Sequence, residues 1–412
     1  MAARVSCQGL RGQNMRGMMA SLSSEERLAF RDQVRRLLAD RSTEKDVRRT
    51  MELDAGYDPA LWRQLAELGV VGLVIDPEYG GAGAGPMELE LVMEEAGAAL
   101  LCGPLLSSGV LAAGLIGALG DRDAAARLLP GIADGSRIAT VALTGPLSGG
   151  GGGWTEADVA VTAARAGDGW VLDGAAGFVT HGHIADTLLV VARTAAGVRV
   201  FEVDPAGPGV ARHRLPSFDR TLRLADIRFA RAPARLLAAA NGAAWPAVER
   251  ALALTLVALA GEQAGAGRRI LDITVDYAKT RIQFGRPIGS FQAIKHMAAN
   301  LLLESESAVS AARAAAAALA AAPLAAAPLA APLAAEAPEA ARAAAEAVSL
   351  AAFACADAFV TIAADAIQMH GGIAFTWEHP AHLYLRRARA DAQLFGAPAY
   401  HRERFIRCLE TA

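Results

Sequence analysis

The spacing of apolar residues changes twice along this chain, and this change most limits the folds that the chain can adopt. From Ser23 to Leu129 apolar residues recur at helical spacing, as in L-A-F-R-D-Q-V-R-R-L-L and M-E-L-E-L-V-M-E-E-A. From Ile138 to Arg235 the pattern becomes short β-branched runs, such as T-L-L-V-V-A-R, separated by Gly, Asp and Pro. From Trp245 onward the helical period returns. The sequence therefore predicts an α+β protein.

The predicted boundaries follow from these changes of period. We expect an extension without order at 1–22, an N-terminal helical domain at 23–137, a middle β-domain folded as a sandwich or barrel at 138–238, and a C-terminal helical bundle at 239–412. With 412 residues the chain is long enough for two or three packed layers and a large core.

Charge and cysteine usage exclude several classes of protein. The net charge is −3 and no dense Lys/Arg block is present, so nucleic acid is not an expected partner. Four cysteines, Cys7, Cys102, Cys355 and Cys408, lie far apart and show no C-x-x-C spacing. This spacing argues against a metal site or a disulfide framework and favours thiols in a reducing cytoplasm.

Two segments resemble targeting or membrane signals. Residues 1–22 carry arginines without acids, but Met18 and Met19 come just before a serine-to-glutamate capping spacing at Ser23, so an upstream mis-start is an alternative to an extension. An uncharged alanine-rich run at 314–335 is long enough to cross a membrane, but three prolines interrupt it. We interpret 314–338 as an Ala/Pro-rich insertion between two antiparallel helices and expect no membrane span.

Residues 281–296, R-I-Q-F-G-R-P-I-G-S-F-Q-A-I-K-H, join a fixed cation to residues that favour turns. The Arg281 guanidinium can bind a diphosphate through two hydrogen bonds, and Gly285 and Gly289 let backbone approach a ligand closely. Pro287 removes a competing donor. The pattern predicts a nucleotide clamp, and a surface turn with an exposed arginine is the alternative.

This segment closely resembles the R-x-x-F-G-x-x-I-x-x-F-Q passage of the acyl-CoA dehydrogenase family. Two further stretches, E-Y-G-G-A-G from Glu78 and A-D-A-I-Q-M-H-G-G-I-A-F from Ala364, also resemble that family, so the resemblance runs from Ser23 to Ala397. It implies an N-terminal helical domain, a middle β-domain and a C-terminal four-helix bundle that forms homo- or hetero-oligomers. It also implies FAD, an acyl-CoA substrate, an electron-transfer partner and a cytoplasmic location.

The resemblance assigns cofactor contacts to particular residues. Arg281 would hold the FAD diphosphate, and Phe284 and Gln292 would line the adenosine side. Gln368, Gly371 and Gly372 would reach the same cofactor from a neighbouring subunit, although the two glycines alone also fit a turn that ends a helix. Against the flavin ring the resemblance places Leu143, Thr144, Phe178 and Thr180. The family's T-E-P-G-x-G-S-D is T-G-P-L-S-G-G here, and both threonines also suit ordinary strands.

The catalytic base of the family is missing from its usual positions. The glutamate that would precede Gly396 is Phe395, and the other family position, on the long core helix, is Thr255. Neither side chain accepts a proton at neutral pH. Glu262 and Asp391 are the remaining candidates, and each has a structural alternative, Glu262 as a hydrogen-bond partner of a neighbouring loop and Asp391 as a surface acid.

Three expectations about function follow. The first is an FAD-dependent acyl-CoA dehydrogenase that desaturates an acyl-CoA thioester between its α and β carbons, using a displaced base. The second is a non-catalytic or half-site partner subunit of a hetero-oligomeric acyl-CoA dehydrogenase, and a flavin monooxygenase is a minor third. We expect no metal, because His379 and His382 have usable ligand spacing but no third ligand nearby.

Overall fold

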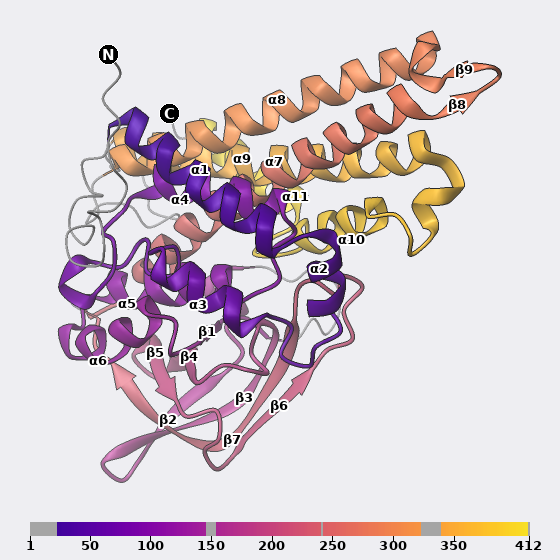
Figure 1. Cartoon of the computed structure of the whole chain (residues 1–412). Coiled ribbons are helices and arrows are strands. Elements are labelled where there is room, and N and C mark those ends of the chain that lie inside the picture. Colours follow the sequence, from indigo (N-terminus) through magenta and orange to yellow (C-terminus); the bar gives the residue numbers. More distant parts are fainter. Residues whose placement is uncertain (1–22, 146–153, 240–241, 323–338, 411–412) are drawn as a thin grey trace, which may run out of the picture.

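The computed structural model describes residues 23–145, 154–239, 242–322 and 339–410. Figure 1 shows indigo and purple helices, a pink block of strands beneath them, and orange to yellow helices that extend to one side. The α+β class predicted from the sequence is confirmed. The predicted extension at 1–22 lies outside the described residues.

The N-terminal helices begin where the sequence predicted a cap. Ser23 accepts a hydrogen bond from the Glu26 N–H, and the Glu26 carboxylate accepts one from the Ser23 N–H at 2.8 Å, which completes a capping box. The helical segments of this part are α1 (Ser24–Arg41), α2 (Glu44–Thr50), α3 (Pro59–Glu67), η2 (Pro77–Tyr79), α4 (Pro86–Ala98), η3 (Leu105–Ala112), α5 (Ala113–Leu119) and α6 (Arg122–Ala133).

The middle segment forms a barrel-like sheet. Its strands are β1 (Ala139–Ala142), β2 (Thr162–Ala166), β3 (Gly169–Thr180), β4 (Thr187–Thr194), β5 (Gly197–Val203), β6 (Val210–Arg214) and β7 (Leu224–Leu237), with a 3-10 turn, η4 (Glu156–Asp158), before β2. The pairing order is β1-β4-β2-β3-β7-β5, and β4 also pairs with β5, which closes the sheet on itself. Closure leaves few free strand edges.

The C-terminal part is built on long helices joined by a hairpin. Its elements are α7 (Trp245–Thr280), β8 (Ile282–Gln283), β9 (Arg286–Pro287), η5 (Ile288–Ser290), α8 (Gln292–Ala321), α9 (Glu339–His370), η7 (Gly371–Phe375), α10 (Ala381–Asp391) and α11 (Pro398–Glu410). α9 packs on α7, α8 and α11, so these four helices form the bundle. The β8–β9 hairpin lies at the end of an arm formed by α7 and α8 (Figure 1).

Glycines let α4 and α7 cross at very short distance. A Cβ atom on Gly265 of α7 would lie 1.9 Å from the carbonyl oxygen of Glu94 on α4. A Cβ on Gly97 of α4 would lie equally close, 1.9 Å, to the carbonyl oxygen of Glu262. Any side chain at these positions would force the helices apart. The crossing thus fixes the position of α7 against the N-terminal helices, and with it the position of Glu262.

The Ala/Pro-rich tract differs from its prediction over its first residues. α8 continues through Ala321, so 314–321 belong to a helix whose Ala315 and Ala316 are buried. Alanine has the highest helix propensity, and the first proline of the tract comes only at Pro323. Residues 323–338 lie outside the described residues.

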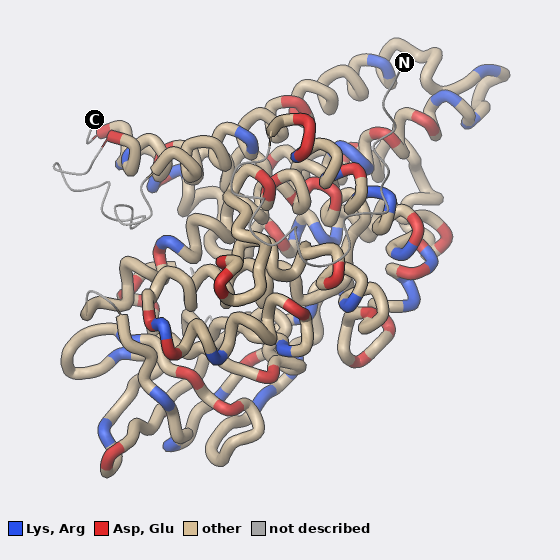
Figure 2. Tube along the Cα trace, turned by 60° about the vertical axis from the view of Figure 1, so that its left-hand side comes forward, with Lys and Arg blue, Asp and Glu red and all other residues tan. Residues whose placement is uncertain are grey.

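One helix in the described part of the chain is long and apolar enough to cross a membrane. It spans Glu339–Phe375, and half of its most apolar window is buried inside the protein. Because a buried bundle helix passes the same test, and α9 packs on neighbouring helices, we assign this segment to the bundle core. Figure 2 shows basic and acidic residues interspersed over the described chain.

Candidate functional site

The predicted clamp is a hairpin at the end of the α7–α8 arm. Arg281 is the first residue after α7, its N–H donates to the Tyr277 carbonyl oxygen at 2.8 Å, and its side chain is exposed. Phe284 and Gly285 form the two-residue turn between the hairpin strands, with φ of 51° and 75°. Two positive φ values are typical of a type I′ turn. Phe284 is 92% exposed, so its ring is accessible to another molecule.

Contacts between arginine and aromatic side chains hold the shape of the hairpin. The Arg286 guanidinium lies 4.0 Å from the centre of the Phe291 ring, and the Phe284 and Phe291 rings are 6.1 Å apart. Gln292 is exposed at the start of α8. The sequence suggested that Gly289 faces a ligand. It faces α7 instead, because a Cβ there would lie 2.9 Å from the Ala278 carbonyl oxygen. Its role is to let the loop pack against α7.

The second predicted group of cofactor contacts lies at the end of α9. Gln368, Gly371 and Gly372 are exposed, and Gly371 has a φ of 69° that ends the helix. A Cβ on either glycine would meet no heavy atom within 4 Å among the described residues, so the backbone is open to a ligand. The Tyr277 and His370 ring centroids are 4.5 Å apart, which ties this group to the turn of α7 before Arg281.

This combination of groups fits a diphosphate. A guanidinium in solvent supplies paired donors, and exposed glycine backbone allows close approach of phosphate oxygens. The elements that carry the two groups meet at the contact between the Tyr277 and His370 rings, and the resemblance has the second group reach the cofactor from a neighbouring subunit.

The third group lies in the β-domain. Leu143 and Thr144 directly follow β1, and Phe178 and Thr180 lie at the end of β3. The Gly177 N–H donates to the Thr144 carbonyl oxygen at 3.0 Å, so these strand ends lie side by side. Phe178 is partly exposed with a φ of 54°, and the other three side chains are buried. The glycine run at 146–153 beside them lies outside the described residues.

One chain does not bring this third group to the clamp. The hairpin lies at the end of the arm, and the β-domain lies at the other side of the molecule (Figure 1). A cofactor site that uses both groups therefore takes them from two different chains, which is the arrangement implied by the resemblance.

Neither position of the family's base carries a group that can accept the proton. The Thr255 hydroxyl is buried and donates to the Ala251 carbonyl oxygen at 2.7 Å. Phe395 is 4% exposed and packs edge-to-face on Trp154, with ring centroids 5.1 Å apart. The groups beside Gly396 are Tyr400 and His401, which a Cβ at that glycine would meet at 2.6 and 2.7 Å.

Glu262 is held by a buried arginine. The Arg387 guanidinium donates to the Glu262 carboxylate, and its Nε donates to Asp219 at 2.9 Å. A further donor of Arg387 reaches the Thr221 hydroxyl at 2.8 Å. Burial opposes the charge of Arg387, but Glu262, Asp219 and Asp391 outweigh it and raise the Arg387 pKa. This cluster joins α7, α10 and the loop before β7.

Asp391 is not the surface acid that the sequence suggested. Its side chain is 2% exposed, and its Oδ2 has no hydrogen-bond partner among the described residues. Burial, and next the charge of Glu262, raise the pKa of the Asp391 carboxyl well above its ordinary value. The adjoining cavity, which Glu262 and Arg387 also line, measures about 20 Å³. This is room for about one water molecule and not for an acyl chain.

Several of these residues were not predicted from the sequence. Trp154 follows a glycine run, and Arg387 stands among Arg386 and Arg389, so no local pattern marks the first as a partner of Phe395 or the second as buried. Asp219 lies 168 residues before its partner Arg387. Such contacts are visible only after folding.

The histidines and cysteines carry no further site. The His370 and His379 ring centroids lie 4.3 Å apart, but among the described residues no group of three His, Cys, Asp or Glu is arranged to hold a metal ion. Cys102, Cys355 and Cys408 are buried thiols, and Cys7 lies outside the described residues.

Comparison with known proteins agrees with this fold. The family model for the acyl-CoA dehydrogenase N-terminal domain matches residues 24–136, and that for the C-terminal domain matches residues 242–409. The fold and these matches define the class: the chain belongs to the acyl-CoA dehydrogenase family.

The chain is similar to several individual members of this family. The chain is 36% identical to acyl-CoA dehydrogenase IpdE2 of Mycobacterium tuberculosis over 375 residues, which covers 91% of this chain and 94% of that protein. It is similar to the structure of the ChsE4–ChsE5 complex from the same organism, with a TM-score of 0.81, 27% identity and coverage of 95% and 99% of the two chains. A glutaryl-CoA dehydrogenase from Mycobacterium smegmatis in complex with FADH2 shares the fold, with a TM-score of 0.82, 21% identity and coverage of 95% and 96%.

Proposed function

We propose that this chain is the non-catalytic partner subunit of a hetero-oligomeric acyl-CoA dehydrogenase. It would supply the diphosphate and adenosine side of an FAD site to a subunit that carries the base. The observation that carries the proposal is the Phe395–Trp154 ring pair, at the position that the resemblance assigns to the base.

Proton abstraction needs a carboxylate within reach of the α-carbon of the substrate. Glu262 is a poor candidate, because its carboxylate is already engaged by the buried Arg387 guanidinium. Thr255 is committed to a backbone carbonyl oxygen. The cavity of about 20 Å³ beside these residues leaves no space for an acyl group. Acyl-CoA would therefore bind to the other subunit.

In such an assembly the clamp would still bind FAD. Arg281 would hold the FAD diphosphate, the main chain at Gly371 and Gly372 would lie against it, and Phe284 and Gln292 would line the adenosine. Bound FAD would accept the hydride from the β-carbon and later pass its electrons to an electron-transfer partner. The ChsE4–ChsE5 structure, to which this chain is similar, is a complex of two named components, which supports a hetero-oligomeric setting.

The test is to purify the chain alone and together with a paralogous subunit that has the glutamate. We expect flavin absorbance and acyl-CoA oxidation only in the joint preparation. Substituting the base of the paralogue should abolish oxidation, whereas Glu262→Gln in this chain should leave the turnover of the complex unchanged. Oxidation of an acyl-CoA by this chain alone at ordinary rates would rule out the proposal.

A second candidate, a desaturase that uses Asp391 as a displaced base, is favoured by one observation. Asp391 lines the small cavity with an oxygen that has no partner there, and its raised pKa suits a proton acceptor. Under this alternative the chain alone would oxidise an acyl-CoA, and Asp391→Asn would reduce the rate by about 10²-fold or more. An Asp391→Asn protein with an unchanged rate would exclude it.

A further inference from the structure

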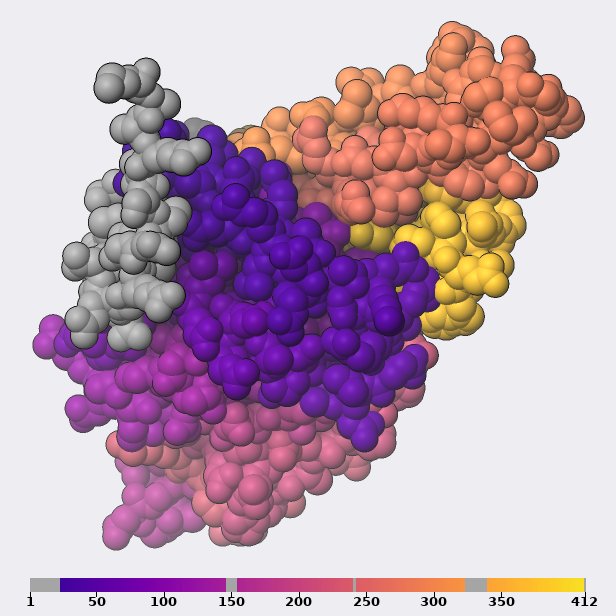
Figure 3. Space-filling view, in the orientation of Figure 1, coloured from indigo at the N-terminus to yellow at the C-terminus, as the bar shows by residue number. Residues whose placement is uncertain are grey.

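A large cleft lies away from both the clamp and the small cavity. It is a hollow between the indigo N-terminal helices and the salmon and yellow C-terminal helices (Figure 3). Its volume is about 850 Å³, and its walls come from α1, α2, α4, α7, α8 and α10. A cleft of this size can enclose a small organic molecule. None of the residues assigned to FAD lines it.

The polar residues of the cleft carry one more positive than negative charge. Five arginines line it, together with four carboxylates, Glu44, Glu94, Glu95 and Asp272. Three of the arginines have carboxylate partners within hydrogen-bond or ion-pair distance: Arg35 on Glu95, Arg313 on Glu94 and Arg268 on Glu306. The remaining two are held less closely: Arg31 has carboxylate partners only at 3.8 to 4.0 Å, and Arg269 has none within 4.0 Å among the described residues.

Arg31 on α1 is the more buried of these two guanidinium groups. Its side chain is only 19% exposed, and its nearest carboxylate oxygens, on Glu95, Glu94 and Asp32, lie 3.8 to 4.0 Å away. Its Nε is buried and donates no hydrogen bond within the described part of the chain. A buried guanidinium donor without an acceptor is costly, so this site favours an added acceptor.

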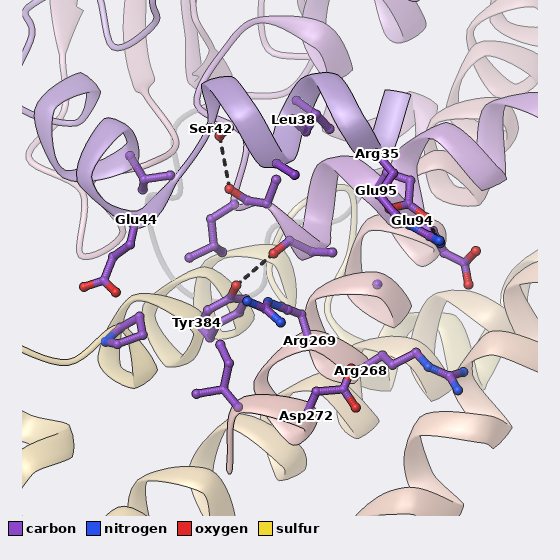
Figure 4. A pocket seen from close by; sticks show the side chains of 18 of the residues that line it. Arg35, Leu38, Ser42, Glu44, Glu94, Glu95, Arg268, Arg269, Asp272 and Tyr384 are labelled. Atoms are coloured by element: carbon purple, nitrogen blue, oxygen red, sulfur yellow. Dashed lines mark hydrogen bonds and ion pairs between the residues drawn. The ribbon is translucent and has the colours of Figure 1, made fainter. Parts of the chain in front are cut away.

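Arg269 lies on the opposite wall, on α7 (Figure 4). Among the described residues it has no carboxylate within 4.0 Å, and its polar neighbour is the Tyr384 hydroxyl. That hydroxyl already donates to the Ala98 carbonyl oxygen at 2.8 Å. The loosely paired Arg31 guanidinium and the Arg269 guanidinium thus line one cleft from two helices.

The rest of the cleft is apolar and rigid. Leu38, Val47, Leu100 and Leu383 line it and are themselves buried by the surrounding helices. Leu100 has a φ of 47°, a conformation that costs a bulky residue free energy and is found most often at functional sites. A ligand with an apolar body would cover this lining.

We propose that this cleft binds a small amphipathic carboxylate, a monoanion with an aliphatic body. The Arg269 guanidinium and the Arg31 Nε–H supply donors for one carboxylate group, whereas the four carboxylates of the walls would repel a dianion such as a phosphate ester. The carboxylate accepts from Arg269 and Arg31, and the aliphatic body covers the leucine lining. This site is independent of FAD and of the role proposed above.

The proposal is tested by calorimetric titration of the full chain with octanoate, octan-1-ol, acetate and inorganic phosphate. Octanoate should bind at least tenfold more tightly than octan-1-ol, which lacks the charge, and than acetate, which lacks the body. Phosphate should bind at least tenfold more weakly than octanoate. Arg269→Gln should weaken octanoate binding at least tenfold, because it removes a charge-assisted hydrogen bond.

Two further variants guard against a folding artefact. Ile273→Trp fills the cleft without changing its charge and should weaken octanoate binding by a similar factor. Arg63→Gln removes an exposed arginine outside the cleft, with its side chain 72% exposed, and should leave the affinity unchanged. Equal binding of octanoate and octan-1-ol would overturn the proposal, as would wild-type octanoate affinity in both Arg269→Gln and Ile273→Trp.

Discussion

Phe395 packs edge-to-face on Trp154 with ring centroids 5.1 Å apart, although its own φ of 58° is one that bulky residues rarely adopt. Such an aromatic pair contributes about 0.5 to 1.5 kcal/mol beyond area burial, which helps to hold the strained backbone. Gly396 follows with a φ of 118°. At the position that the resemblance assigns to the family's Glu-Gly pair, this chain thus has an aromatic side chain on a backbone of positive φ.

Replacing Phe395 by Glu should destabilise the protein, because it places a carboxylate at a position that is 4% exposed and faces Trp154. We expect a loss of about 3 kcal/mol or more in the free energy of unfolding. Phe395→Leu is the apolar control and should cost about 1 to 1.5 kcal/mol. Urea denaturation measures both. A Phe395→Glu protein of wild-type stability that oxidised acyl-CoA would show that the site is open.

Replacing Arg281 by Ala should lower FAD affinity in the joint preparation by roughly one to two orders of magnitude, because a charge-assisted contact to the diphosphate is lost. Flavin absorbance after dialysis measures the retained cofactor. Lys279→Ala removes an exposed cation two residues earlier and serves as the control. Full flavin retention by Arg281→Ala would refute the assigned role.

Replacing Arg387 by Met should cost about 3 to 5 kcal/mol, because Glu262 and Asp219 would remain buried without a counter-charge. Adding Glu262→Gln and Asp219→Asn should recover part of this loss, since both carboxylate charges are then removed. Arg389→Ala on the same helix is exposed and should have little effect. Thermal unfolding of the four proteins checks the order. Equal stability of Arg387→Met and wild type would mean that the cluster is solvated.

The pH dependence of stability should report on Glu90, which is 1% exposed on α4. Burial, and next the charge of Glu94, raise the Glu90 pKa from 4.5 to about 8. The folded state therefore binds a proton that the unfolded state releases between these two values, and stability falls as pH rises through this window. The slope from this group is about 1.4 kcal/mol per pH unit.

Glu90→Gln keeps the shape of the side chain without the charge, so it should remove this part of the slope. Glu67→Gln, at an exposed position on α3, should retain the wild-type slope. Unfolding free energies measured at several pH values between 5 and 8 decide the matter. Parallel slopes for Glu90→Gln and wild type would contradict the assignment.

The sequence by itself determined the succession of helical, β and helical parts, the capping box at Ser23 and the identity of the residue at the base position. These features depend on local periodicity, on turn chemistry and on motif spacing, which a chain carries in its order of residues. The hairpin of the clamp is of this kind, because Phe284 and Gly285 form its turn within a few residues of Arg281.

The tertiary structure alone decided what surrounds those residues. It brought Asp219 to Arg387 across 168 residues, buried Asp391, placed Trp154 on Phe395 and set Arg31 and Arg269 on the walls of one cleft. The physical reason is that burial and ion pairing depend on which distant elements meet, and helix crossings such as that of α4 on α7 set those meetings. Local patterns specify a helix face but not its neighbour.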